Sequence, residues 1–445
     1  MLGLIGAVAL AGVLAGCERP VYLAGQRFDT RTPLDETLPA TAGGAVADAA
    51  AAVNRSAPVA VGGAVSNAEW SHRAGSAARA MPNLALSASP QRVWSAAIGA
   101  ADNRRNRVAT APIVAGGKVF AMDARNRVTA LSTANGGTVW SLDVTPTGES
   151  AEGAGGGGLA HGAGLLFVTT GFGELLAVNP ASGGVAWRQK FDGPVSGAPA
   201  VVGSTVYVSG RDGAGWAVNA ADGKIAWVQP GVRRGAGVAG GVAPAVTDRL
   251  VIMPYSAGQV IALDRAKGEP KWQGAVAGQR FGRAAAFVTD LTGDPVVSGG
   301  KVYVGSAAGR TAAFALETGA MLWEAREGAM GPVWPVGNAV FLVSDIGSLV
   351  RLDAGTGETV WSVPMGHFTK EKVRRQNTVV AHYGPVLAGG RLVVASSDGL
   401  VRFFAPDSGA ALGVIQMPAG AAAAPAVAGG TLYVVTDNGQ VQAFR

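Results

Sequence analysis

The side chains suited to acid–base or metal chemistry are few and scattered. The four histidines, His72, His161, His367 and His382, show no spacing typical of a metal site. Acidic residues stand singly, and the one cysteine, Cys17, excludes intramolecular disulfides, multi-thiolate metal sites and CxxC redox chemistry. Each histidine fits a surface position or a satisfied loop position better than a ligand position. This inventory argues against an enzyme.

Charge and glycine patterns exclude two further classes of partner. The net charge is +6, but the basic residues are scattered rather than gathered on one element, as nucleic-acid binding requires. The glycine run at 155–158 precedes no helical pattern, so it carries no nucleotide-binding signal. We expect no nucleic-acid partner.

The chemistry expected of Cys17 is lipidation. Residues 2–16 form an uncharged apolar run, too short to span a membrane and typical of a signal peptide, although no Lys or Arg precedes it. The run ends in Leu14-Ala15-Gly16-Cys17, which resembles the bacterial lipobox. The resemblance implies that residues 1–16 are a cleaved signal peptide and that Cys17 carries the lipid anchor.

The elements that follow divide into a tether and a folded body. Residues 17–89 are Ala-rich and of low complexity, which indicates a tether, although Trp70 and Leu84 in its richer part are suited to docking on the body. Over the whole chain, 67 glycines, 48% hydrophobic residues and 15% charged residues indicate many tight turns around a large core. No later segment has 18 consecutive apolar residues, so everything after Cys17 is expected in an aqueous compartment.

From residue 90 the sequence repeats. A glycine is followed four residues later by tryptophan in six places, as in LDAGTGETVW at 352–361, and a seventh copy at 404–413 has Gly413 in place of the tryptophan. The repeated glycines are 136, 183, 223, 268, 319, 357 and 409, at separations of 38 to 52 residues. Periods of this length are typical of repeat folds.

Each repeat predicts four short antiparallel strands. A first strand such as Ala-Pro-Ala-Val at 198–201 precedes a hairpin with a Gly, Asp-Gly or Asn-Gly turn, and the strand with tryptophan follows. The last repeat lacks this fourth strand, and an orphan strand around Trp94 is available to supply it. We therefore predict that residues 90–445 form an all-β, eight-bladed β-propeller whose C-terminal blade is completed by the N-terminal strand.

The blade sequence, as in VYVGSAAGRTAAFALETGAMLW at 302–323, resembles the pyrroloquinoline-quinone-like (PQQ-like) propellers. In that family the tryptophan packs between neighbouring blades. The resemblance therefore implies a structural, interblade position for seven residues: Trp94, Trp140, Trp187, Trp227, Trp272, Trp323 and Trp361.

The lipobox, the tether and the eight-bladed propeller together resemble the family of outer-membrane protein assembly factor BamB lipoproteins. The resemblance implies a non-catalytic scaffold of the β-barrel assembly (BAM) complex, anchored at the periplasmic face of the outer membrane, without a cofactor or metal. The implied partners are the POTRA domains of a BamA-type insertase, other BAM lipoproteins and unfolded outer-membrane proteins.

Two interblade connections resemble the partner-binding loops of that family. The first contains Val232, Arg233 and Arg234, and the second contains Asp290 and Thr292, with Thr292 standing where a second acid is common. The alternative interpretation is ordinary solvated loop charge of little energetic worth.

Two other functions stay open at the level of sequence. A quinone-dependent dehydrogenase has a similar propeller, but the adjacent cysteines often found in that class are absent and the chain is short for it. A propeller that binds an envelope ligand at its channel mouth is the other alternative, and no motif supports it.

Overall fold

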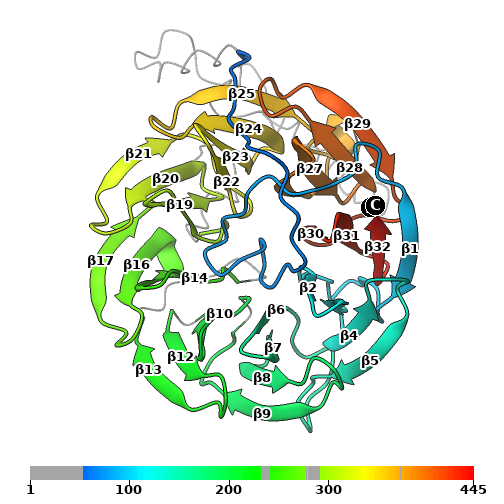
Figure 1. The fold of residues 1–445 in the computed structure, drawn as a ribbon, viewed down its shortest axis with the longest axis vertical. Helices are drawn as coiled ribbons and strands as arrows, with labels where there is room; N and C mark the ends of the chain where they lie inside the picture. Colours follow the sequence, from blue (N-terminus) through cyan, green and yellow to red (C-terminus); the bar gives the residue numbers. More distant parts are fainter. Residues whose placement is uncertain are drawn as a thin grey trace, which may run out of the picture. The chain divides into compact units, whose positions relative to one another are not determined.

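The computed structural model describes residues 54–445 apart from Ser196, Asp212, residues 232–240, Ala277, residues 279–290 and Glu371. All of them belong to one compact unit, residues 44–445. Over the described residues, eight four-stranded antiparallel sheets stand around a central channel as the blades of a propeller (Figure 1). The predicted fold class is confirmed.

Blades 1 to 4 follow one another along the chain, each with its strands in order from the channel to the rim. Blade 1 contains β2 (Ile113–Ala115), β3 (Lys118–Met122), β4 (Arg127–Ser132) and β5 (Thr138–Asp143). Blade 2 contains β6 (Gly157–Gly162), β7 (Leu165–Thr170), β8 (Glu174–Val178) and β9 (Val185–Lys190). Blade 3 contains β10 (Ala200–Val202), β11 (Thr205–Ser209), β12 (Gly215–Asn219) and β13 (Ile225–Gln229). Blade 4 contains β14 (Ala245–Val246), β15 (Leu250–Pro254), β16 (Gln259–Asp264) and β17 (Pro270–Ala275).

Blades 5 to 8 complete the ring. Blade 5 contains β18 (Val296–Ser298), β19 (Lys301–Ser306), β20 (Arg310–Ala315) and β21 (Met321–Ala325). Blade 6 contains β22 (Trp334–Val336), β23 (Ala339–Val343), β24 (Ser348–Asp353) and β25 (Thr359–Pro364). Blade 7 contains β26 (His382–Ala388), β27 (Arg391–Ser396), β28 (Leu400–Phe404) and β29 (Ala411–Gln416). Blade 8 contains β30 (Ala426–Ala428), β31 (Thr431–Thr436), β32 (Gln440–Phe444) and β1 (Arg92–Ala97).

Helical structure is slight in the described residues. There, two 3-10 turns, η2 (Ser256–Gly258) and η4 (Val373–Arg375), lie between strands. Nowhere in the described part of the chain is there a helix with the length and apolar character needed to cross a membrane.

Blade 8 closes the ring by pairing the two ends of the propeller sequence. Strand β1 is antiparallel to β32, with Trp94 opposite Ala443. The backbone amide of Gln91 donates to the carbonyl of Arg445 at 2.7 Å, and the amide of Arg445 donates to the carbonyl of Gln91 at 2.9 Å. The predicted completion of the last blade is confirmed, and it removes two free sheet edges.

The glycine and the tryptophan of the repeat meet across neighbouring blades. Gly183 of blade 2 has φ +76°, and a Cβ atom there would lie 2.8 Å from the ring of Trp140 in blade 1. Glycine is therefore required both for the turn and for the space that the indole occupies. The same contact pairs Trp94 with Gly136, Trp187 with Gly223, Trp227 with Gly268, Trp272 with Gly319, and Trp323 with Gly357.

The alternation of antiparallel strands gives the ring two distinct faces. The turns between first and second strands and between third and fourth strands lie on one face, called here the plug face. The turns between second and third strands lie on the opposite face together with the connections between blades, and we call it the loop face. The described ends of both connections with predicted partner-binding residues therefore lie at the loop face.

Candidate functional site

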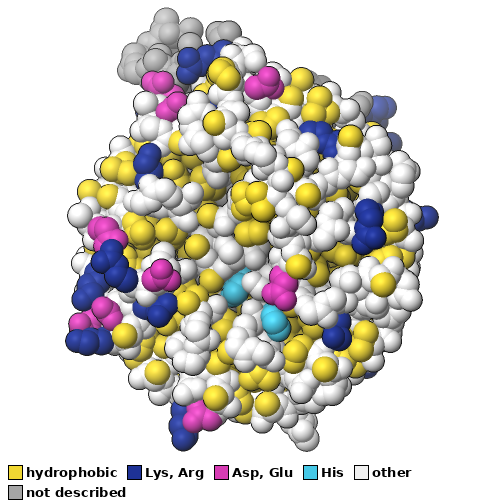
Figure 2. Space-filling model, viewed as in Figure 1, with side chains coloured by type: hydrophobic (Ala, Val, Ile, Leu, Met, Phe, Trp, Pro, Cys, Tyr) yellow, Lys and Arg dark blue, Asp and Glu magenta, His cyan; other side chains and the backbone are white. Residues whose placement is uncertain are grey.

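The N-terminal segment, residues 54–89, crosses the mouth of the channel on the plug face, as the dark blue chain in Figure 1 shows. Its central part, residues 67–84, is called here the plug. On this face, Figure 2 shows atoms filling the centre of the ring and charged side chains lying mostly toward the rim. From residue 54 onward, the stretch that the sequence assigns to a tether is thus packed against the propeller.

The plug contacts the innermost strand of every blade. In seven blades this contact includes a hydrogen bond between the plug and the innermost strand: Trp70 N to Val114 O at 2.8 Å, His161 N to Ser71 O at 2.8 Å, Val201 N to His72 Nε2 at 3.0 Å, Val246 N to Ala77 O at 2.9 Å, Val297 N to Ala78 O at 3.0 Å, Leu84 N to Leu387 O at 3.1 Å, and Asn67 Nδ2 to Val427 O at 2.7 Å. Blade 3 is reached by the ring of His72, and blade 6 by the ring of Trp70.

Two large side chains anchor the plug in the core. Trp70 and Leu84, which the sequence singled out for docking, are 1% and 0% exposed. Trp70 stacks on Trp334 of β22, with ring centroids 6.5 Å apart and planes inclined by 17°. Both belong to an apolar cluster shared with blades 1, 6, 7 and 8. Burial of side chains of this size contributes roughly 1.5–3 kcal/mol each, which holds the plug to the ring.

Two of the four histidines serve as buried hydrogen-bonding groups, His72 in the plug and His382 at the start of β26. His72 Nε2 accepts a hydrogen bond from the amide of Val201 at 3.0 Å, and burial together with the charge of Arg79 lowers the pKa of His72 to about 3. His382 Nδ1 lies 2.7 Å from Ser396 Oγ, and burial also lowers its pKa. Both rings are therefore neutral at physiological pH.

A buried ionic cluster links the plug to the loop face. The guanidinium of Arg79 is 0% exposed, and its Nε lies 3.6 Å from Oδ2 of Asp294, whose side chain is also 0% exposed. Arg73 Nε lies 3.2 Å from the same oxygen. Burial lowers the pKa of Arg79 to about 10, and the Asp294 carboxylate opposes that shift, so the guanidinium stays charged at neutral pH.

The two arginines also hold the backbone beside Asp294. Arg79 Nη2 donates to the carbonyl of Pro244 at 2.7 Å, and Arg73 Nη1 donates to the carbonyl of Gly241 at 3.2 Å. Oδ1 of Asp294 accepts from the amide of Ala243 at 2.9 Å. One carboxylate thus binds the plug on one side and the start of blade 4 on the other.

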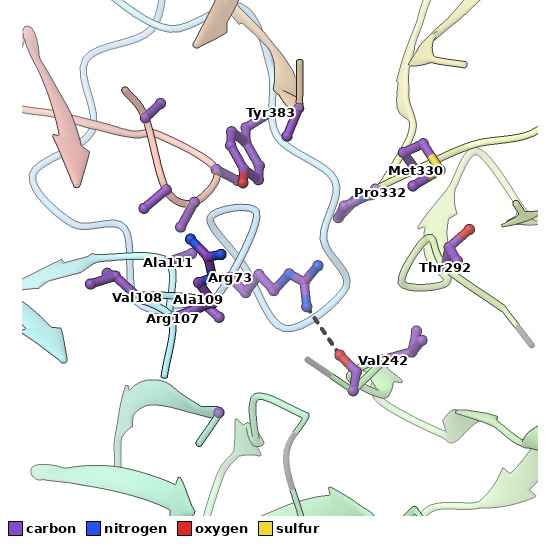
Figure 3. Close-up of a pocket in the computed structure, with 18 of the residues that line it drawn as sticks. Arg73, Arg107, Val108, Ala109, Ala111, Val242, Thr292, Met330, Pro332 and Tyr383 are labelled. Atoms are coloured by element: carbon purple, nitrogen blue, oxygen red, sulfur yellow. Dashed lines mark hydrogen bonds between the residues drawn. The ribbon is translucent and has the colours of Figure 1, made fainter. Parts of the chain in front are cut away.

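Beyond the plug, the channel forms a cavity of about 990 Å³ at the loop face (Figure 3). Arg73 projects across it, and Arg105, Arg107, Arg211 and Asp102 line it further out. In the part of the chain that the structure describes, no group of three or more His, Cys, Asp or Glu side chains is placed to hold a metal ion.

Two buried donors on the cavity wall are unpaired within the described residues. They are the hydroxyl of Tyr255 and the indole Nε1 of Trp334. Burial raises the pKa of Tyr255, so its hydroxyl keeps its proton at physiological pH.

Most residues predicted to bind a partner or a lipid lie outside the described residues. These are Cys17, Val232, Arg233, Arg234 and Asp290. Thr292 is described: it is 8% exposed, and its hydroxyl donates to the carbonyl of Ala329 at 2.6 Å. Its role in partner binding stays a prediction.

The structure brings the C-terminal ends of the two predicted partner-binding connections together. Gly241 to Pro244 end the first connection, and Leu291 to Asp294 end the second. The hydrogen bond from Ala243 N to Asp294 Oδ1 joins them across 51 residues of sequence. The two connections therefore enter the ring at adjacent points.

The predicted site residues did not include Arg73, Arg79 or Asp294. One signal was available, because Asp294 occupies the position that alanine occupies in the Ala-Pro pairs opening the first strands at 111, 198, 243 and 424. A charge at a channel-lining position requires a buried partner. The sequence around Arg79, AGSAARAMPN, gives no sign that it supplies one.

Comparisons with known proteins agree with this architecture. The sequence model of the family described as outer membrane protein assembly factor BamB matches residues 124–363 and 347–445. The Legionella pneumophila protein of that name is 26% identical over 201 residues, which cover 44% of this chain and 49% of that protein. The Burkholderia pseudomallei protein is 27% identical over 285 residues, covering 61% of this chain and 72% of that protein. The chain thus spans about half of the first relative and nearly three quarters of the second.

Solved structures show the same fold. The crystal structure of BamB from Moraxella catarrhalis superposes with a TM-score of 0.64 at 18% identity, covering 80% of this chain and 100% of that one. A quinohemoprotein alcohol dehydrogenase from Comamonas testosteroni gives a TM-score of 0.62 at 15% identity, covering 86% of this chain and 81% of that one. At these identities the likeness concerns the fold alone.

Proposed function

Because the chain belongs to the outer membrane protein assembly factor BamB family, we propose that it is a non-catalytic scaffold lipoprotein of the β-barrel assembly complex. In this proposal it binds POTRA domains of a BamA-type insertase, alongside other lipoproteins of the complex. It aids the insertion of β-barrel proteins into the outer membrane.

The observation that carries the proposal is the meeting of the two interblade connections at the loop face. Residues 241–244 and 291–294 are joined directly by the Ala243–Asp294 hydrogen bond. The connections that they end contain Arg234 and Asp290, so the two connections together carry both signs of charge. A partner with an exposed sheet edge, as in a POTRA domain, offers backbone groups and charges that such loops recognise.

In this proposal the lipid anchor precedes a segment that first meets the ring at the rim of blade 6, whereas the partner binds at the loop face. Asn54, the first described residue, hydrogen bonds to Ser362 on the outermost strand of blade 6. From there the chain leads back to Cys17, and at 3.3–3.6 Å per residue it reaches at most roughly 130 Å. In this arrangement the periplasmic face of the outer membrane holds the lipid while the loop face stays accessible.

The binding test uses the full-length, detergent-solubilised lipoprotein and a purified POTRA-domain fragment of the insertase. We expect the double charge reversal Arg234→Glu with Asp290→Lys to raise Kd at least about tenfold, because it reverses both charged contacts. The melting temperature should stay nearly unchanged, since the proposal gives both charges to the partner and charges in solvated loops contribute little to stability.

The matched control is Arg249→Glu, which reverses an exposed arginine at the opposite face of the ring. It should leave Kd unchanged. Equal affinities of the wild-type chain and the double variant would count against these loops as the binding site.

Anchor and partner are tested together by mass spectrometry of the lipoprotein isolated from membranes. An acylated Cys17 peptide recovered with the insertase would support both. Recovery of the acylated protein without the insertase would contradict the scaffold role. Quinone and calcium with an artificial electron acceptor would then test for a dehydrogenase, and ligand screening by thermal shift would test for a ligand-binding propeller.

A further inference from the structure

Asp294 lies where three separate stretches of chain converge. It ends one predicted partner-binding connection, its Oδ1 accepts from Ala243 at the end of the other, and its Oδ2 faces Arg73 and Arg79 of the plug. Figure 3 shows the long side chain of Arg73 reaching from the plug toward the wall that carries Val242. The plug therefore touches both connections from inside the channel.

Because the charges of this cluster are buried, Asp294 and the two arginines are stable in place only together. The side chains of Asp294 and Arg79 are both fully buried. A carboxylate or guanidinium withdrawn from water is tolerated only while its counter-charge and hydrogen-bond partners are in place. If the plug leaves, Asp294 loses both arginines, and the carbonyls of Gly241 and Pro244 lose their donors.

We propose that the plug is a positioning element for partner binding: Arg73 and Arg79 fix Asp294 and the Gly241–Pro244 backbone, which couples docking of the plug to binding at the loop face. The proposal rests on the proposed function, since it concerns the same two connections. It assigns a role to a segment between the lipid anchor and the propeller.

The coupling follows from the cost of ordering loops. A loop whose ends are free must be ordered when the partner binds, and that entropy is subtracted from the affinity. Holding residues 241–244 and 291–294 in advance removes part of this cost. Because coupling between two sites is reciprocal, a bound partner should in turn hold the plug more firmly in the channel.

A purely structural role for the plug predicts something different. In that case any substitution that loosens the N-terminal segment would lower stability without a specific effect on the partner. The chain offers a matched control in Arg351, a second buried arginine that holds the same segment. It donates to the carbonyls of Ala57 and Pro58 at the opposite end of the segment, and none of its hydrogen bonds among the described residues reaches either connection.

The experiment compares full-length variants for POTRA-fragment affinity, melting temperature and hydrogen exchange at Ala243. Asp294→Asn keeps an acceptor for the Ala243 amide but removes the charge, and Arg73→Ala removes the less buried arginine. We expect each to raise Kd by about tenfold, within the usual range of coupling between sites, and to speed exchange at Ala243. Arg73→Lys, which keeps the charge, should recover part of the affinity.

Arg351→Ala should lower the melting temperature at least as much as Arg73→Ala while changing Kd less than about twofold. The proposal is overturned if Arg73→Ala and Asp294→Asn bind as tightly as the wild-type chain, or if all three variants lose affinity in proportion to lost stability. Should Asp294→Asn fail to fold, Arg73→Ala alone decides, because that side chain is 24% exposed.

Failure of the proposed function gives a separate result. If the wild-type chain does not bind the POTRA fragment, the scaffold role falls, and the coupling to that partner falls with it. If the wild-type chain binds and the loop charge reversal weakens binding, but the plug variants do not, only the coupling is wrong.

Discussion

Two arcs of the ring are held together in different ways. Around the first arc, from the junction of blades 8 and 1 to that of blades 5 and 6, each tryptophan ring covers a glycine turn of the next blade. Its indole Nε1 also donates to a carbonyl there. The six acceptors, in order around the ring, are Thr133, Pro180, Ala220, Arg265, Leu316 and Ala354.

On both sides of blade 7, this combination of a tryptophan–glycine contact and an indole hydrogen bond is incomplete. Trp361 still lies against Gly409, but its indole Nε1 has no hydrogen-bond partner among the described residues. At the next position Gly413 replaces the tryptophan, and a Cβ atom there would meet nothing within 4 Å. The junctions of blade 7 with blades 6 and 8 therefore need other stabilising contacts.

The N-terminal segment supplies these contacts. On its way in, Arg55 N donates to Val360 O and Ala57 N donates to Asp407 O, which joins blades 6 and 7. Arg351 stands opposite Trp361, where the six other blades with a repeat tryptophan have alanine, and it binds the carbonyls of Ala57 and Pro58. On its way out, the segment is held by Arg391, which donates to the carbonyls of Ser87 and Ala88.

Ring closure explains why the tryptophan is missing at the junction of blades 7 and 8. A tryptophan of blade 7 would need a glycine turn between the third and fourth strands of blade 8. Those strands are β32 and β1, the two ends of the propeller sequence, and no turn joins them. The comparison teaches that the repeat is interrupted where the ring is closed, and that the segment upstream of the ring covers the interruption.

The largest expected effect comes from removing a tryptophan of the regular arc. Trp323→Ala should lower the free energy of unfolding by about 3–5 kcal/mol, because a side chain only 7% exposed leaves a cavity between blades and the Ala354 carbonyl loses one of its two side-chain donors. Denaturant unfolding measures it. A loss below 1 kcal/mol would contradict the importance of this junction.

The glycine turns should be nearly as sensitive. Gly223→Ala places a Cβ atom 2.7 Å from the ring of Trp187 at φ +76°, so we expect a loss of about 2–4 kcal/mol from strain and overpacking. The control is Gly203→Ala, at φ +61° with nothing within 4 Å, which should cost about 1 kcal/mol. Equal losses in thermal unfolding would show that conformation alone requires glycine.

The start of the N-terminal segment, residues 54–58, should detach locally from blades 6 and 7 when Arg351 is replaced. Arg351→Met removes the guanidinium that donates to the carbonyls of Ala57 and Pro58, at a cost of about 1–3 kcal/mol. Hydrogen exchange should speed up at the amides of Arg55 and Ala57 and stay slow at Leu84, which binds blade 7 independently. Uniform acceleration along the segment would mean that it docks as a single unit.

A smaller difference separates two tryptophans of the two arcs. Trp323→Phe loses the hydrogen bond to Ala354, whereas Trp361→Phe loses none that the described residues make. Trp323→Phe should therefore cost about 1 kcal/mol more. Paired denaturant curves give this difference, and the reverse order would contradict the distinction between the arcs.

The smallest effect is expected from restoring the repeat. Gly413→Trp adds the missing ring, but blade 8 offers it no glycine turn, so stability should change by less than about 0.5 kcal/mol, as for an exposed surface substitution. A gain in melting temperature as large as the decrease caused by Trp323→Ala would show that the new indole packs against blade 8 as the other tryptophans pack against their neighbouring blades.

Much of the fold could be predicted from the sequence because the information is local and repeated. Glycines such as Gly183 mark turns by their conformation, the alternating strands fix four-strand units, and the orphan strand at Trp94 matches the vacancy in the last unit. The segment with Trp70 and Leu84 was also visible as a docking candidate. Its route across the channel was not, because its contacts with the eight blades, made by backbone and side chains alike, leave no periodic pattern in the sequence.

The sequence by itself therefore determined the blades, their number and the closure of the ring, since turn chemistry and strand period act over a few residues. Only the tertiary structure decided that Gly183 receives Trp140 from the preceding blade and that Arg79 neutralises Asp294 in the channel. A buried charge needs a counter-charge nearby in space, and the chain brings that partner from any distance in sequence. Such pairings are fixed by how the ring closes around the plug, and no local pattern records them.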